Sequence, residues 1–353
     1  MTASLLTKKN PIFRPLRYLK NLYEIGYVTN YNNLKIYPEH FRDNLSLRES
    51  TRLFKRSVTT IYIEPFSYCN RTCSFCANST VDRRSRNILM DPKLFQYIVR
   101  SLKTINYSEK IHLYRYNEPL SNDKIFDSIA YIRRELPNSK MFIASNGDFL
   151  QKGTLEKLRD SGLNRIYITP YLNDYSVDNV LEKGEELCER LMKRLNIKAT
   201  KNKGTSELKA IRYDLSMDQL QISIFAKNLQ HALDRGQSVS IGDQPFLRES
   251  PCFEPFRKFD IDYKGQVMAC CNIHSDVSSH QSLISAPISI EKGNFFTSYT
   301  SPTVVEWRRK LVAPKISIEA CRSCEMNADH IGNVINSSGL EEYTKNIQKL
   351  MSL

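Results

Sequence analysis

The hydrophobic and polar positions of residues 58–170 follow two alternating periods. Short β-branched and aromatic runs, typical of strands, are separated by longer segments whose apolar residues recur at helical spacing. The predicted strands are 58–65, 111–116, 139–145 and 164–170, and the predicted helices between them are 91–105, 122–136 and 155–162. Asp91 and Pro92 have the character of a helix start, and Gly162 that of a helix end. Strands and helices that alternate at this spacing predict βα units and a parallel sheet.

Beyond residue 170 the pattern is less regular. It predicts helices over 180–197 and 217–236, strands over 208–216 and 238–242, and a polar surface loop over 198–207. With the first four strands, these segments predict an α/β fold with a partial (β/α)6 barrel.

Near residue 250 the alternation stops, and residues 259–262 and 267–271 read as the strands of a β-hairpin. We therefore expect three parts. These are a basic N-terminal extension (1–57), a barrel domain (58–245) and a small α+β domain with the hairpin (246–353).

Composition and charge narrow the class of protein. Hydrophobic residues make up 41% of the chain and charged residues 25%, as in ordinary soluble proteins. No apolar run is long enough to span a bilayer, and the N-terminus lacks the apolar core of a signal peptide, so a cytoplasmic location is the default expectation. The net charge is +13, from 51 basic and 38 acidic side chains. About half of this excess lies in residues 1–57, which we interpret as a solvated extension or, alternatively, a docking surface for an acidic partner or lipid headgroup. No nucleic-acid-binding motif accompanies the charge.

Nine cysteines, an odd number, indicate metal ligation or catalysis rather than a disulfide framework in a reducing compartment. Three of them, Cys69, Cys73 and Cys76, follow the first predicted strand with the spacing C-x3-C-x2-C. The carboxyl ends of parallel strands are where active sites lie. Three thiolates suit iron and leave one iron of a four-iron cluster open to another ligand. A structural zinc site, the alternative, needs four ligands, usually as two pairs.

This triplet, with Phe75 before its last cysteine, resembles the signature of the radical S-adenosylmethionine (SAM) superfamily. The resemblance implies a [4Fe–4S] cluster whose open iron is chelated by SAM, reduced by a donor such as flavodoxin or ferredoxin. It also implies cleavage of SAM to a 5′-deoxyadenosyl radical, which takes a hydrogen atom from the substrate.

Later positions match family motifs that contact SAM. Besides Phe75, the resemblance assigns cofactor-binding roles to Glu118, Ser145, Asn146 and Thr169. Glu118 stands in Asn117-Glu118-Pro119, where the family has a Gly-Gly-Glu-Pro-like motif. The glutamate is kept, so its role carries over. Both glycines are replaced, so their backbone contacts do not.

A second cysteine group occupies the C-terminal part. It resembles the auxiliary-cluster domains called SPASM and, in the shorter form, twitch. The resemblance implies one auxiliary [4Fe–4S] cluster with four ligands: Cys252, Cys270, Cys321 and Cys324. Cys271 competes with Cys270, since neighbouring strand residues face opposite sides. A zinc knuckle made by the same thiolates is the alternative, and Cys188, inside a predicted helix, is expected to be an inert core thiol.

Four protein ligands leave the second cluster no open iron, so electron transfer is its expected role. The cysteine spacing resembles that of the radical SAM alcohol dehydrogenases of aminoglycoside biosynthesis, which implies oxidation or a related modification of a sugar-like or other polar small molecule. A maturase of a ribosomally made peptide is the second hypothesis, and a non-catalytic iron–sulfur protein the third. No catalytic base is assigned: His112, Tyr114 and Tyr116 share one strand face, as do Tyr62 and Glu64, but a core or surface role is the default for these side chains.

Overall fold

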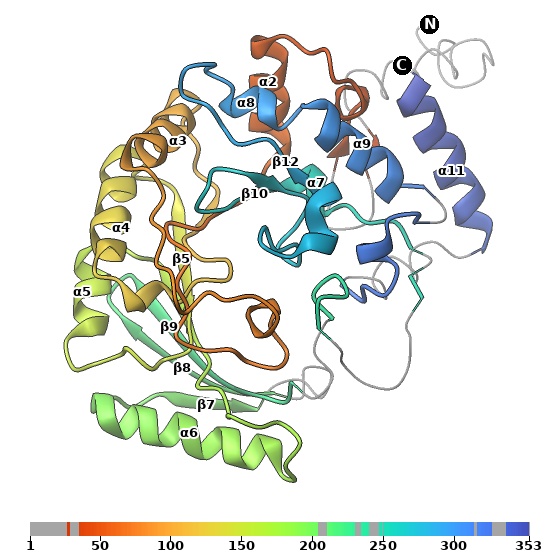
Figure 1. The fold of residues 1–353 in the computed structure, drawn as a ribbon. Helices are drawn as coiled ribbons and strands as arrows, with labels where there is room; N and C mark the ends of the chain where they lie inside the picture. The colour runs from red at the N-terminus through yellow and green to blue at the C-terminus, as the bar shows by residue number, and fades with distance from the viewer. Residues whose placement is uncertain are drawn as a thin grey trace, which may run out of the picture.

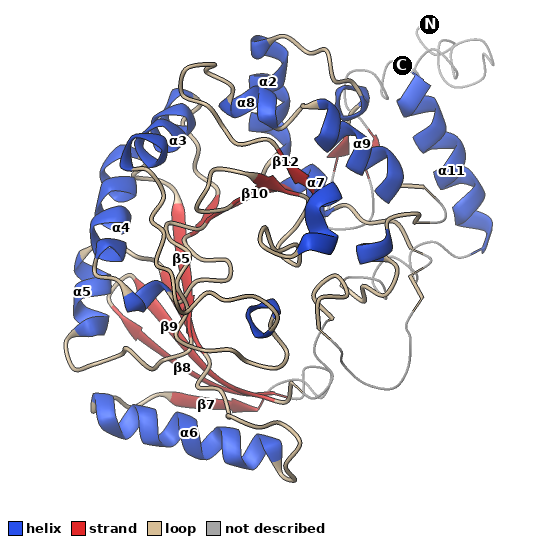
Figure 2. Cartoon of the chain, in the orientation of Figure 1, coloured by secondary structure: helices blue, strands red, loops and turns tan. Residues whose placement is uncertain are grey.

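The computed structural model describes residues 27–28, 35–203, 210–229, 234–239, 247–248, 250–313, 316–326 and 337–352. The described chain has an α/β fold organised around one curved, ten-stranded sheet (Figure 1). Helices line the outer side of this sheet, and most loops gather on its concave side (Figure 2). The predicted fold class is therefore confirmed.

Six neighbouring strands of the sheet are parallel. In spatial order they are β10 (Lys258–Ile261), β3 (Thr60–Ile63), β4 (Lys110–His112), β5 (Lys140–Ser145), β6 (Arg165–Ile168) and β9 (Leu220–Lys227). Four helices connect the successive strands from β3 onward: α3 (Pro92–Thr104), α4 (Lys124–Glu135), α5 (Thr154–Asp160) and α6 (Val180–Leu195). Strand residues such as Ile61, Ile111 and Ile166 are fully buried in the main core, which explains the period-2 signal.

The two ends of the sheet are antiparallel. One end adds β8 (Ala210–Met217) and β7 (Thr200–Lys203), and the other adds β11 (Val267–Met268) and β12 (Ile284–Ser285). Cys188 lies in α6 and is fully buried, as expected of a core thiol.

After residue 195 the structure differs from the predicted elements at three places. The prediction of a helix over 217–236 is wrong for Leu220–Lys227, which forms β9. Met217 pairs with Leu220 across a tight turn, so the chain reverses into a strand there. Asp218 has a φ of 52° in that turn, a conformation usually marked by glycine, so the hairpin carried no glycine signal. The prediction of a loop over 198–207 is wrong for Thr200–Lys203, which forms the strand β7. Of the strand over 238–242, residues 238–239 lie in a turn and the remainder lies outside the described residues.

The N-terminal part contributes α2 (Leu47–Ser57), which starts with a capping box between Ser46 and Glu49. Phe54 of α2 is fully buried, and its ring lies 5.3 Å from that of Phe259 and 5.4 Å from that of Phe295 (centroid distances). One face of α2 therefore packs into the core, while most of its charged residues stay exposed.

The division of the chain at residues 57 and 245 stays a prediction. The structure adds that the hairpin of the C-terminal part joins the barrel sheet directly, because β10 pairs with β3 in parallel. The remaining elements are β1 (Tyr27–Val28), β2 (Lys35–Ile36), η1 (Pro38–Phe41), η2 (Ala77–Ser79), η3 (Pro119–Ser121), α7 (Glu254–Arg257), η5 (Ser278–Leu283), α8 (Phe295–Ser298), α9 (Pro302–Leu311), η6 (Glu319–Cys321) and α11 (Ser337–Ser352). A search of the described residues finds no helix with the length and apolar character that crossing a membrane requires.

Candidate active site

The cysteine loop (residues 69–76) follows β3 and is held against the turn after β5. Nε and Nη2 of Arg71 each lie 2.6 Å from an oxygen of the Asp148 carboxylate, which is a two-point ion pair. Asn70 donates to the same carboxylate at 2.7 Å and accepts a hydrogen bond from Asn146 at 2.8 Å. Residues between the first two cysteines thus fix the loop above the strand ends, although the motif does not specify these residues.

The three thiols of the loop suit a metal cluster by their chemistry. Burial raises the pKa of Cys69 to about 12 and that of Cys73 to about 11, and it also raises the pKa of Cys76. Thiols in such surroundings become thiolates when a metal supplies positive charge. No three His, Cys, Asp or Glu side chains of the described chain are close enough to ligate a single ion. A four-iron cluster differs from a single ion because each cysteine binds a different iron.

A cavity of about 470 Å³ lies beside the loop. All three loop cysteines line it, and so does each predicted SAM-contacting residue: Phe75, Glu118, Ser145, Asn146 and Thr169. The volume is within the range of small-molecule sites. The structure therefore brings the predicted cofactor-binding residues to one place, while their individual contacts with SAM stay a prediction.

Glu118 has a positioning role that the sequence did not indicate. Its carboxylate accepts hydrogen bonds from the Ser145 hydroxyl (2.8 Å), the Asn146 amide (2.7 Å) and the Leu120 amide (3.0 Å). Glu118 is 2% exposed, and burial raises its pKa to about 7 despite these bonds. The side chain joins the loop after β4 to the turn after β5, so it shapes the cavity wall.

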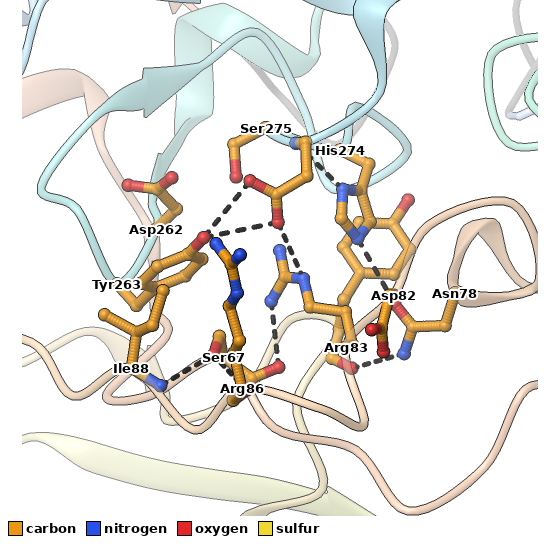
Figure 3. Close-up of polar contacts among 12 residues, drawn as sticks. Ser67, Asn78, Asp82, Arg83, Arg86, Ile88, Asp262, Tyr263, His274 and Ser275 are labelled. Atoms are coloured by element: carbon orange, nitrogen blue, oxygen red, sulfur yellow. Dashed lines mark hydrogen bonds and ion pairs between the residues drawn. The ribbon is translucent and has the colours of Figure 1, made fainter.

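A buried polar network behind the cysteine loop was also missed by sequence reasoning. Oε1 of Glu64 accepts hydrogen bonds from the amides of Tyr116 (2.9 Å) and Asn117 (3.1 Å), and it pairs with Arg83 at 3.1 Å. Arg83 in turn pairs with Asp276 at 2.8 Å, from the C-terminal part of the chain. Figure 3 shows Arg83 between the loop and that part, with Tyr263 and His274 nearby. These contacts are long-range and leave no local sequence pattern.

Aromatic side chains from neighbouring strands stack in a row on the concave face of the sheet. The rings of Tyr62, His112, Phe142, Tyr167 and Phe225 follow one another with centroid distances of 4.4, 4.8, 6.3 and 6.1 Å. Burial lowers the pKa of His112 to about 3, so this imidazole is neutral at physiological pH. The first and the last two members of the row also line the cavity.

The second cysteine group lies next to this cavity. The pKa of Cys270 is raised by burial and then by its thiol neighbours, which include Cys271 and the other three predicted ligands: Cys252, Cys321 and Cys324. Cys270 and Cys271 follow the end of β11. Cys271 lines the cavity, and Cys270 is not among the lining residues.

A chain of hydrogen bonds connects the two cysteine groups. Nε of Arg235 donates to the carbonyl of Phe75 at 3.4 Å, and Nη1 donates to Oδ1 of Asn272 at 3.1 Å. The amide nitrogen of Asn272 lies 3.8 Å from Sγ of Cys324. Arg235 therefore contacts the first cysteine loop and, through Asn272, the second group.

Comparison with known proteins shows which proteins this chain resembles. The radical SAM superfamily matches residues 63–194. The S-adenosyl-L-methionine-dependent 2-deoxy-scyllo-inosamine dehydrogenase of Niallia circulans is 31% identical over 111 residues, which is 31% of this chain and 44% of that protein. The match thus spans less than half the length of that relative. The crystal structure of BtrN in complex with AdoMet and 2-DOIA has a TM-score of 0.50 at 18% identity, covering 72% of this chain and 87% of that one, which indicates a shared fold. Residues 63–194, which carry the cysteine loop and most of its cavity, are thus similar to the radical SAM superfamily.

Proposed function

We propose that this protein is an enzyme that reductively cleaves SAM and abstracts a hydrogen atom from a bound substrate. Cys69, Cys73 and Cys76 hold a [4Fe–4S] cluster, which together with SAM supplies a 5′-deoxyadenosyl radical. The family match over residues 63–194 supports this proposal, as does the presence of all three thiols in one cavity with the matched motif positions.

We further propose that the reaction is a dehydrogenation of a polar, sugar-like small molecule. Oxidising an alcohol carbon to a carbonyl removes one hydrogen atom, one proton and one electron. The hydrogen atom forms 5′-deoxyadenosine, the proton leaves to solvent, and the electron requires an acceptor other than SAM. A second [4Fe–4S] cluster held by Cys252, Cys270, Cys321 and Cys324 is that acceptor in this proposal.

One observation carries the dehydrogenation proposal more than any other. The cavity is lined by the three loop cysteines and also by Cys271, whose neighbour Cys270 is a predicted ligand of the second cluster. A substrate held in this cavity would lie beside both the cysteine loop and Cys271. The named activity of the Niallia circulans relative is a dehydrogenation of an inosamine, which agrees with this class of reaction.

The test is anaerobic purification with measurement of iron, sulfide and zinc, followed by incubation with SAM and a reductant. About eight irons per chain are expected for two four-iron clusters, and about four would remove the second cluster from the proposal. Cys73→Ala should abolish 5′-deoxyadenosine formation, whereas Cys324→Ala should retain it and lower the iron content by about four. Absence of 5′-deoxyadenosine from the fully loaded wild-type protein would refute the proposed enzyme.

A further inference from the structure

The cavity contains more positive than negative side chains. Four cationic residues line it, namely Arg71, Arg115, Lys227 and Arg235, and Glu118 is the one acidic residue among the described lining side chains. Such an excess is informative where the charges are partly buried, because an uncompensated charge away from water is costly.

Two of these cations already have carboxylate partners. Arg71 pairs with Asp148 at 2.6 Å, and Arg115 lies 3.4 Å from a carboxylate oxygen of Asp260. Both partners lie outside the cavity lining. The charges of these two arginines are therefore balanced by the protein.

Lys227 and Arg235 have no such partner among the described residues. Among the described residues, Arg235 donates to the carbonyl of Phe75 and to the side chain of Asn272, neither of which is charged. The nearby groups that raise its pKa, which include the thiols of Cys76 and Cys271, contain no carboxylate. Lys227 ends β9, and its ammonium lies 4.8 Å from the centroid of the Phe225 ring. Burial, and then the nearby charge of Arg235, lowers the pKa of Lys227, as expected for two cations on one cavity wall. No described carboxylate forms an ion pair with either residue.

The unsatisfied buried polar atoms of the cavity wall are also donors. Nη1 of Arg115 and Nδ2 of Asn117 have no hydrogen-bond partner within the described part of the chain, and both residues line the cavity. Buried acceptors without a partner occur nearby on Glu64 and Asp260, but these residues do not line it. These two atoms have almost no accessible surface and do not face the open cavity, so the preference for an anionic ligand rests on Lys227 and Arg235.

We propose that the substrate carries an anionic group, such as a phosphate or carboxylate, and that Lys227 and Arg235 bind this group at the carboxyl end of β9. This inference rests on the proposed function, since it concerns the substrate of the same cavity. An ammonium and a guanidinium are the side chains that bind such oxyanions. A ligand with an amino group would instead add a third positive charge beside two unpaired ones. The substrate of this chain therefore differs in charge from the inosamine named for the relative.

A second anion in the cavity would be the carboxylate of SAM, and the experiment must separate the two. Calorimetry on cluster-loaded protein gives the dissociation constant of SAM alone, and then those of three cyclitols added to the SAM complex. The probes are myo-inositol, myo-inositol 1-phosphate and 2-deoxy-scyllo-inosamine. The variants are Lys227→Gln, Lys227→Arg and a matched control, Lys93→Gln, which removes an exposed lysine on α3.

The wild-type complex should bind the phosphate at least about tenfold more tightly than neutral inositol, as expected for a charged hydrogen bond. Lys227→Gln should abolish this preference and leave SAM affinity within about twofold, while Lys227→Arg and Lys93→Gln should retain it. Tighter binding of the amine than of the phosphate would overturn the inference. So would an unchanged phosphate preference in Lys227→Gln, with or without a loss of SAM affinity. Because binding is measured without turnover, failure of SAM cleavage would refute the proposed function separately.

Discussion

Removing the guanidinium of Arg83 tests whether the network behind the cysteine loop stabilises the fold. The side chains of Arg83 and Glu64 are 2% and 0% exposed, and Nη1 of Arg83 lies 3.1 Å from Oε1 of Glu64. The same guanidinium reaches Asp276 at 2.8 Å and the carbonyl of Ser67 at 3.0 Å. Arg83→Met keeps an extended apolar side chain but leaves the carboxylate of Glu64 buried without its ion-pair partner.

The expected loss of stability follows from the burial of the Arg83–Glu64 pair. Removing one member of a buried ion pair costs about 3–5 kcal/mol, because the other charge stays uncompensated. Glu64→Gln should cost less, about 1–2 kcal/mol, since its amide oxygen still accepts hydrogen bonds from Tyr116 and Asn117 and Arg83 keeps Asp276. The double variant should cost at least about 1 kcal/mol less than the sum of the single variants, because it leaves no lone charge from this pair.

Urea denaturation of the cluster-loaded protein under anaerobic conditions, followed by the fluorescence of the single tryptophan, measures these differences. Lys310→Met is the control, because it removes an ion pair with Glu306 whose members are 48% and 61% exposed. That control should change the free energy of unfolding by less than about 0.5 kcal/mol. A loss in Arg83→Met no larger than in the control, or strict additivity in the double variant, would refute the reasoning.

Three further predictions concern the site. Cys270→Ala should lower the iron content by about four atoms per chain and Cys271→Ala should leave it unchanged; the reverse result, by iron analysis, would exchange their roles. Asn272→Ala should shift the auxiliary cluster to a more negative midpoint potential, because it removes the amide donor at Cys324. An unchanged potential in a redox titration followed by electron paramagnetic resonance would contradict this. Asp148→Asn should raise the dissociation constant of SAM about tenfold without loss of iron, since the cysteine loop loses its two-point ion pair. Equal SAM affinity by calorimetry would show that the loop needs no such support.

The sequence predicted those parts of the fold whose pattern is local. The strands and helices between residues 58 and 170 have clean periods because each strand buries one side against helices, as Ile61 and Ile166 do. The segment 217–236 was misread because Ile222, Ile224 and Ala226 of β9 face the core next to polar residues that also fit a helix. The turn that starts β9 uses Asp218 at a positive φ instead of glycine.

The candidate site likewise has residues that local sequence signals predict and residues that they do not. Cysteine spacing and short motifs after strand ends are local signals, so the sequence predicts Glu118 and Asn146 as site residues, and both line the cavity. Arg83 and Arg235 were not predicted, because their partners are distant in sequence: Arg83 pairs with Asp276, and Arg235 contacts Phe75 and Asn272. Only the folded chain brings Arg235 to the cavity and Arg83 to the network behind the cysteine loop.

The sheet itself explains why the two cysteine groups are neighbours. The parallel pairing of β10 with β3 sets Asp260 opposite Tyr62 and Ile261 opposite Ile63. It therefore places the carboxyl end of β10, and the turn that returns through β11 to Cys270, at the same sheet edge as the cysteine loop. Arg115 strengthens this arrangement, since it pairs with Asp260 and donates to the carbonyl of Cys270 at 3.2 Å. Backbone register rather than a flexible linker therefore sets the separation of the two cysteine groups, and in the proposed reaction this fixes the path of the electron.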